Sequence, residues 1–168
     1  MKKLLRFVKH MASGRWQVAR RFPKRSMHAI EEAIRQSETR HMGELRFAVE
    51  AGLDWADLLA GTSSRKRALE VFSHLHVWDT ERNSGVLIYL LLADRKVEII
   101  ADRGINSCVG DAGWAAICRN MEKKFRAGEF EGGVLEGIAA ITALLRQHFP
   151  AQDADSNSNE LPDYPVTL

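Results

Sequence analysis

Residues 85–105, GVLIYLLLADRKVEIIADRGI, hold most of the continuous apolar sequence of this chain. Two apolar runs, 86–92 and 97–101, are separated by the polar segment 93–96, which is typical of a β-hairpin. The first run is apolar at successive positions rather than at alternate ones, so both faces of that strand are expected to be covered. The stretch therefore predicts a central strand in a sheet that has helices on both sides.

The segments around this hairpin follow an α/β pattern. Residues 44–50, ELRFAVE, alternate between polar and apolar side chains as a strand does. Helical spacing of apolar residues predicts four helices, over 26–40, 64–77, 111–128 and 130–148. Residues 52–61 are expected to form an irregular connection, in which Trp55 either folds back onto a small satellite core or belongs to a partner surface.

The order of these elements fixes the directions of the strands. A helix over 64–77 between strands 44–50 and 86–92 makes a right-handed βαβ unit, so the two strands should be parallel. The hairpin then returns strand 97–101 antiparallel to its neighbour. The sequence therefore predicts an α/β fold, a three-layer αβα sandwich in which a small mixed β-sheet has helices on both faces.

Acid-containing connections should converge at one edge of this sheet. Strands 44–50 and 86–92 begin at the edge where strand 97–101 ends, and the connection before the first strand also contains Glu38. Carboxylate and amide oxygens are the ligands that calcium and magnesium prefer. The predicted ligands of a divalent cation, calcium or magnesium, are Glu44, Asp79, Glu81, Asn83 and Asp102. The alternative is that these are solvated loop residues, whose pairs with arginine stabilise by under about 1 kcal/mol.

Residues 1–25 form a basic N-terminal arm that differs in charge from the rest of the chain. The arm holds nine of the 24 Lys and Arg residues and no acid, which leaves 15 basic groups against 22 acidic ones in the remainder. Leu4, Phe7, Val8 and Met11 recur at helical spacing, which suits an interfacial helix attracted to an anionic membrane surface. A solvated, disordered tail is the main alternative, and nucleic-acid binding is disfavoured because no reading motif is present.

The rest of the chain is predicted to form one domain, residues 26–150, followed by an acidic C-terminal tail, 151–168.

Cys108 and Cys118 are too few for a disulfide framework and lack zinc-finger spacing, which favours a reducing compartment. No export signal is recognised, and the longest uncharged apolar run, 85–93, is too short to span a bilayer. These features predict a cytoplasmic protein, peripheral to the inner membrane if the arm binds lipid.

Common hydrolytic motifs do not occur at their required spacings. A thiol phosphatase needs arginine six positions after its cysteine, where this chain has Trp114 and Lys124. The DxD of an aspartyl-phosphate enzyme occurs only at 153–155, with no strand before it, and there is no GxSxG. Hydrolysis, if it occurs, is therefore expected to be metal-assisted and located at the acidic edge.

The order and spacing of several short segments resemble the TPM domain family, named for a thylakoid lumen protein, a photosystem II repair protein and a modulator of a nematode acetylcholine receptor. The matching segments are Glu38-Thr39, Glu44-Leu45-Arg46, Phe72 to Leu75, Arg82-Asn83, Gly85 to Ile88, Asp94-Arg95, Asp102 to Ile105, Trp114, Met121, Phe125 with Gly128, and Gly133 with Gly137-Ile138. His148-Phe149-Pro150, followed by an acidic stretch and 159–162, is most similar to the short bacterial subgroup.

The resemblance implies a sheet between layers of helices, a divalent-cation site in some members, an acid phosphatase activity attributed to plant members, and association with membrane-protein complexes. Ser84 stands between Asn83 and Gly85, where the family usually joins Asn directly to Gly, so the geometry of Asn83 is expected to shift. We therefore expect a divalent-cation-binding auxiliary or assembly module that associates with membranes. The alternative is a metal-dependent, acid phosphatase-like hydrolase that uses the same acidic edge.

Overall fold

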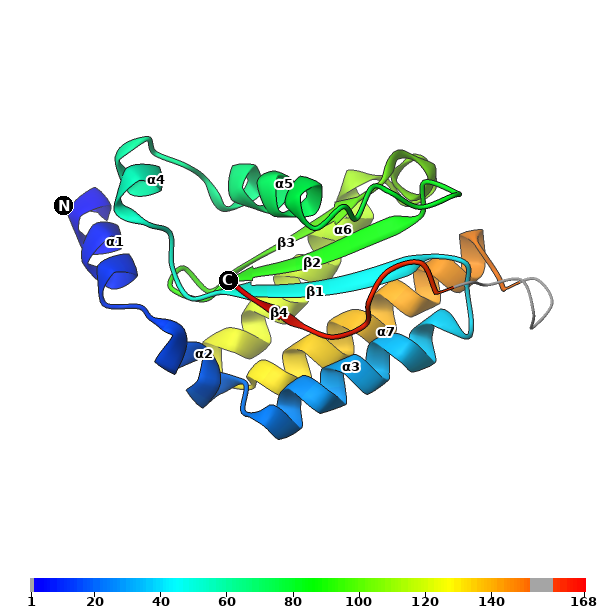
Figure 1. Ribbon diagram of the computed structural model, residues 1–168, viewed down its shortest axis with the longest axis horizontal. Coiled ribbons are helices and arrows are strands. Elements are labelled where there is room, and N and C mark those ends of the chain that lie inside the picture. The colour runs from blue at the N-terminus through cyan, green and yellow to red at the C-terminus, as the bar shows by residue number, and fades with distance from the viewer. Residues whose placement is uncertain (1, 152–158) are drawn as a thin grey trace.

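A computed structural model describes residues 2–151 and 159–168, and its core is a sheet between two layers of helices (Figure 1). The strands are β1 (Glu44–Glu50), β2 (Gly85–Leu91), β3 (Lys96–Ala101) and β4 (Val166–Thr167). One face of the sheet is covered by α5 (Ser64–His74), and the other by α3 (Lys24–Glu38), α6 (Arg103–Arg126) and α7 (Phe130–His148). The predicted three-layer αβα sandwich is confirmed.

The strand order is β3-β2-β1-β4, with β2 at the centre of the sheet's apolar part. β1 and β2 are parallel, with Glu44 opposite Gly85, and β2 and β3 are antiparallel, with Val86 opposite Ala101. The directions expected from the crossover and the hairpin are therefore both confirmed. β4 lies beside β1 in parallel, a strand that the sequence did not indicate because two residues carry no periodicity.

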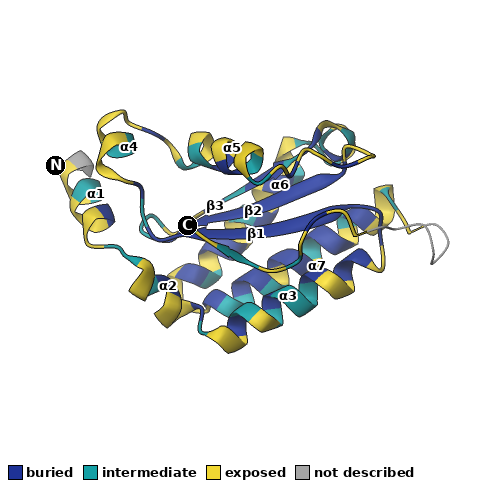
Figure 2. Cartoon of the chain, viewed as in Figure 1, coloured by how far each residue is buried: buried dark blue, intermediate teal, exposed yellow. Residues whose placement is uncertain are grey.

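All seven residues of β2 are buried, as the continuous apolar run predicted (Figure 2). Val86, Ile88 and Leu90 join the larger cluster of buried side chains, which includes residues of α3, α6 and α7. Leu87 and Leu91 join the smaller cluster on the α5 face. Burial on both faces makes β2 the element that connects the two layers.

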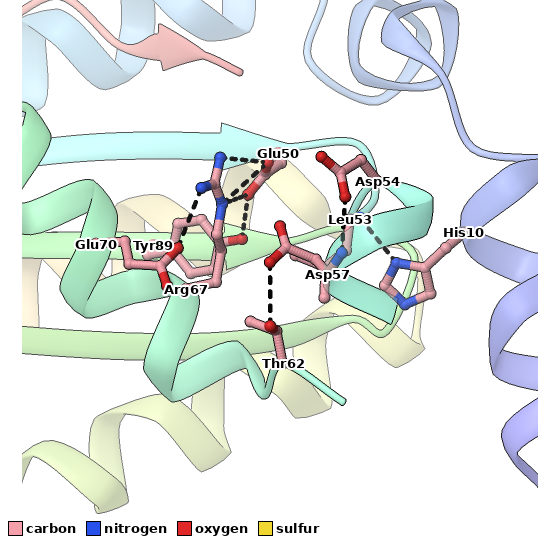
Figure 3. A network of polar contacts seen from close by, with 9 residues as sticks. All are labelled: His10, Glu50, Leu53, Asp54, Asp57, Thr62, Arg67, Glu70 and Tyr89. Carbon is pink, nitrogen blue, oxygen red and sulfur yellow. Dashed lines mark hydrogen bonds and ion pairs between the residues drawn. The ribbon is translucent and has the colours of Figure 1, made fainter. Parts of the chain in front are cut away.

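A partly buried ion pair holds α5 against the sheet (Figure 3). The Arg67 guanidinium donates to both carboxylate oxygens of Glu50, with Nε–Oε2 3.0 Å and Nη2–Oε1 2.9 Å. The Tyr89 hydroxyl also donates to Glu50 Oε2. The network joins α5 to β1 and β2 near the carboxyl end of β1.

Two connections differ from the sequence-based expectation. The segment 102–106, expected to be a loop, begins α6 instead, because Asp102 Oδ1 accepts from Arg103 N at 2.6 Å and Ile105 is fully buried. Gly110, at φ 72°, kinks the helix immediately before Asp111, where the helix was expected to begin. Within 52–61, Asp54 caps a short helix, α4 (Trp55–Leu59), on which Trp55 is 63% exposed.

The N-terminal segment forms two helices, α1 (Lys2–Met11) and α2 (Arg15–Arg21). The helical spacing recognised at Leu4 to Met11 is thus confirmed, and Val18 and Phe22 are buried in the larger core cluster. In the part of the chain that the structure describes, none of the helices combines the length and hydrophobicity needed to cross a membrane.

Gly85 provides a test of how α5 is connected to the sheet. A Cβ at Gly85 would lie 1.8 Å from the carbonyl oxygen of Val77, a backbone atom that cannot rotate away. Gly85→Ala is therefore expected to lower the free energy of unfolding by about 3 kcal/mol or more. Urea denaturation followed by circular dichroism measures the change.

Gly132→Ala is the matched control, because a Cβ there meets nothing within 4 Å and the residue lies in α7. We expect this substitution to be neutral or to stabilise by up to about 1 kcal/mol. Equal stabilities of the two variants would contradict the close contact between Val77 and Gly85.

Candidate functional site

The beginnings of β1 and β2 and the end of β3 lie together at one edge of the sheet. Glu44 N donates to Ser84 O at 3.1 Å, and Asp102 N donates to Gly85 O at 2.9 Å. The three connections that the sequence placed at this edge therefore do meet there.

The five predicted ligands do not share one environment. Glu44 is 1% exposed and Asp102 is buried, whereas Asp79, Glu81 and Asn83 are exposed in the connection before β2. Asp102 uses Oδ1 as the cap of α6, and its Oδ2 is buried without a hydrogen-bond partner. Among residues 2–151 and 159–168, no three His, Cys, Asp or Glu side chains are grouped as ready ligands of a metal ion. The five-residue ligand set remains a prediction.

The C-terminal segment supplies the groups that contact this edge directly. Leu161 N donates to Glu44 Oε2 at 3.2 Å, and the Glu160 carboxylate accepts from Glu81 N at 2.9 Å. The Leu161 side chain is buried in the cluster on the α5 face. The segment approaching β4 therefore lies over the start of β1 (Figure 1).

Arg46, a buried residue two positions after Glu44 on β1, contacts the same segment. Its guanidinium donates to the carbonyl oxygen of Pro162 and lies 5.1 Å from the centre of the Tyr164 ring. Residues 160–164 are thus held by charge-assisted and aromatic contacts, and backbone pairing with β1 follows at Val166 and Thr167. No sequence pattern predicted these contacts, because residues 151–168 have no periodicity.

Glu38, at the end of α3, brings a second buried carboxyl to Glu44. Its Oε1 accepts from Leu45 N at 2.7 Å. Burial, followed by the charge of Glu44, raises the pKa of Glu38 to about 9, against the opposing effect of the Leu45 N–H. The last turn of a helix is also an unfavourable place for a negative charge.

Glu44 has a raised pKa for related reasons. Burial raises the pKa of Glu44 to about 7; the Leu161 N–H lowers it, and the charges of Glu160 and Asp163 raise it again. Asp163 acts on Glu38 as well. We call Glu38, Glu44, Glu160 and Asp163 the acidic cluster. Sequence reasoning predicted Glu44 as a ligand and placed Glu38 in the same connection, but it did not indicate that Glu160 and Asp163 of the tail lie close enough to affect them.

The acidic cluster has the donor chemistry of a divalent-cation site. Glu44 Oε1 is buried and has no hydrogen-bond partner, which is costly for a carboxylate oxygen in a protein interior. Carboxylate oxygens are the preferred ligands of calcium and magnesium. Protonation of the buried Glu38 and Glu44 carboxyls would reduce the repulsion among the negative charges of the cluster. A bound cation could have the same effect.

A buried serine and histidine near this edge have a structural role. Gly43 N donates to His41 Nδ1 at 3.2 Å, so the neutral ring carries its proton on Nε2, 2.7 Å from Ser37 Oγ. Burial lowers the pKa of His41 to about 4. The histidine therefore donates to the serine instead of accepting its proton, which is the reverse of what an activated nucleophile needs.

The sequence model of the TPM domain matches residues 19–144, so this chain belongs to the TPM domain family. No curated protein matches the chain. Among solved structures it is similar to the BA42 protein of the psychrophilic bacterium Bizionia argentinensis, with 30% identity, a TM-score of 0.71, and coverage of 86% of this chain and 93% of that one.

The N-terminal domain of a P. gingivalis protein has the same fold, with a TM-score of 0.59 and 19% identity. That similarity covers 75% of this chain and 79% of the other. The family resemblance recognised in the sequence is therefore confirmed.

The buried carboxyl of Glu38 predicts a pH dependence of stability. Its folded pKa of about 9 lies above the ordinary value of 4.5, so the folded state retains a proton that the unfolded state has lost. Stability should therefore fall as the pH rises from about 4.5 to about 9. Glu44, with its pKa raised to about 7, contributes to the fall below that pH, so the interval from about pH 7 to about pH 9 isolates Glu38. Glu38→Gln keeps an oxygen for Leu45 N and should flatten the slope in this interval, as measured by urea denaturation at a series of pH values.

Glu31→Gln, a change at the accessible side of the same helix, is the matched control and should keep the slope of the unchanged protein. A steep loss of stability persisting in Glu38→Gln would show that another group causes the pH dependence.

Proposed function

We propose that this TPM-domain protein is an auxiliary or assembly module that takes up a divalent cation at the acidic cluster. The observation that carries the proposal is the buried, unpartnered Oε1 of Glu44, a carboxyl group whose pKa is raised by burial and by the charges of Glu160 and Asp163. The four carboxyls of the acidic cluster are not grouped as a ready ligand set, so binding would draw the C-terminal segment toward Glu44. A cation would neutralise this charge and supply the partner that the oxygen lacks.

Calcium suits the acidic cluster better than magnesium. Calcium accepts six to eight oxygens in irregular arrangements, whereas magnesium demands a near-ideal octahedron. Two carboxyls of the cluster lie at ends of α3 and β1, and two lie in the extended segment before β4, so a regular octahedron has no rigid support. Backbone carbonyl oxygens of that segment are additional ligands of the kind that calcium uses.

Cation binding would act on the conformation of the C-terminal segment. Glu160 and Asp163 belong to that segment, while Glu38 and Glu44 belong to the body. A cation shared between the two groups would fasten the segment and β4 to β1. The function is then structural, as expected of a module that assists other proteins.

The hydrolase alternative uses the same edge. A cation bound there would polarise a phosphoryl oxygen and activate water. Glu38 and Glu44 are both buried, so the phosphate would have to reach the cation from the side of Glu160 and Asp163. We therefore favour the auxiliary role.

Calcium titration tests the proposal. Isothermal calorimetry and thermal melting of the full chain are expected to show saturable binding and a raised melting temperature with calcium, and less with magnesium. Glu44→Gln and Asp163→Asn remove charged ligands and should each abolish both signals. Absence of heat and of any thermal shift with either ion would overturn the cation site.

Asp79→Asn and Asp102→Asn distinguish the acidic cluster from the ligands predicted by sequence alone. Both variants should still bind calcium if the cluster holds the ion. Loss of binding in these two variants, with Asp163→Asn unaffected, would move the site to the sequence-predicted set. Calcium-dependent hydrolysis of p-nitrophenyl phosphate, lost in Glu44→Gln, would favour the hydrolase alternative.

A further inference from the structure

α1 attaches to the rest of the protein by its polar side chains. Arg6 Nε donates to Asp94 Oδ2 at 3.0 Å, and Arg6 Nη2 donates to Thr62 O at 3.2 Å. His10 has a fully buried side chain, with Nε2 3.0 Å from Asp94 Oδ1 and Nδ1 accepting from Leu53 N at 2.9 Å (Figure 3). The face of α1 toward the body is therefore charged and hydrogen-bonded.

The apolar residues of α1 lie on its outer side. An amphipathic helix on a globular protein normally packs its apolar face on the core. In α1 the arrangement is reversed, since four large apolar side chains are each more than half exposed: Leu4, Leu5, Val8 and Met11. These side chains form an apolar stripe that is largely open to solvent.

Two neighbouring helices also carry exposed apolar side chains. α4 packs beside α1 (Figure 1), and its Trp55 and Leu59 are 63% and 71% exposed. Trp16, at the start of α2, is 61% exposed. We call the exposed apolar residues of α1, α4 and α2 the docking face. These helices lie at the same end of the molecule, as Figures 1 and 2 show, and exposed apolar side chains on helices suit insertion between lipid headgroups.

A basic hollow lies next to the docking face. It has a volume of about 450 Å³ and lies between the two N-terminal helices and the turn from β2 to β3. Lys9, Arg21 and Arg95 line it. The one acid in its wall, Asp94, is paired with Arg6 and His10, so the remaining charge is positive.

We propose that the docking face binds an anionic membrane surface, with the apolar residues inserted at the headgroup boundary and the basic hollow facing the lipid phosphates. Charge complementarity selects this partner, because residues 1–25 hold nine basic residues and no acid. Exposed tryptophan is typical of the membrane–water interface. The proposal adds α4 and the hollow to the interfacial helix expected from the sequence, and it is independent of the cation site.

Flotation of the full chain with vesicles tests the docking face. We expect recovery with phosphatidylcholine vesicles that contain 30% phosphatidylglycerol, and none with phosphatidylcholine alone. The double variants Leu4→Ser/Val8→Ser and Lys9→Glu/Arg95→Glu should each lower the partition coefficient at least about tenfold, and Trp55→Ser should lower it severalfold. Because these side chains are exposed or line an open hollow, all variants should keep the thermal melting of the unchanged protein.

Leu69→Ser is the matched control, since Leu69 is an exposed apolar residue of α5, outside the docking face. It should bind vesicles as the unchanged protein does. Equal recovery with neutral and anionic vesicles, or unchanged recovery of both double variants, would overturn the proposal. Self-association in solution that Leu4→Ser/Val8→Ser abolishes, without vesicle binding, would assign the face to a second copy of the chain.

Discussion

The structure depends on the burial of β2 on both of its faces. A strand that is apolar at every position cannot leave one face in water, so helices must cover both sides of the sheet. Each large apolar side chain so buried stabilises the fold by about 1.5–3 kcal/mol. The crossover helix α5 covers one face and α3, α6 and α7 cover the other, so the two layers share a single central strand.

The same burial creates an electrostatic problem where the strands begin. Glu38 and Glu44 lie beside the buried end of β1, where water cannot stabilise two negative charges. Their backbone partners, Leu45 N and Leu161 N, satisfy only part of this demand, and the pKa values of both carboxyls rise. Protonation of these carboxyls is therefore expected to change the stability of this edge, and the proposed cation would neutralise the same charges. The C-terminal segment contacts the edge through Glu160 and Leu161, so its conformation would change with the charge.

At the opposite end of the strands, the hairpin turn that defines the fold also positions the N-terminal helix. Asp94 belongs to the turn between β2 and β3 and binds both Arg6 and His10. Because Arg6 and His10 face the body of the protein, Leu4, Leu5, Val8 and Met11 on the other side of α1 face solvent. The acidic cluster and the docking face thus lie at different ends of the sheet and need not act on one another.

The sequence alone determined three of the four strands, β1, β2 and β3, most of the helices and the relative directions of those three strands, because periodicity and crossover handedness are properties of short or consecutive segments. It also brought Glu44 and Asp102 to one edge. Only the tertiary structure decided that Asp102 caps α6, that Glu160 and Asp163 join Glu44, and that α1 faces outward. Glu44 and Leu161 are separated by 117 positions, and such contacts depend on packing between distant segments, which no local pattern encodes.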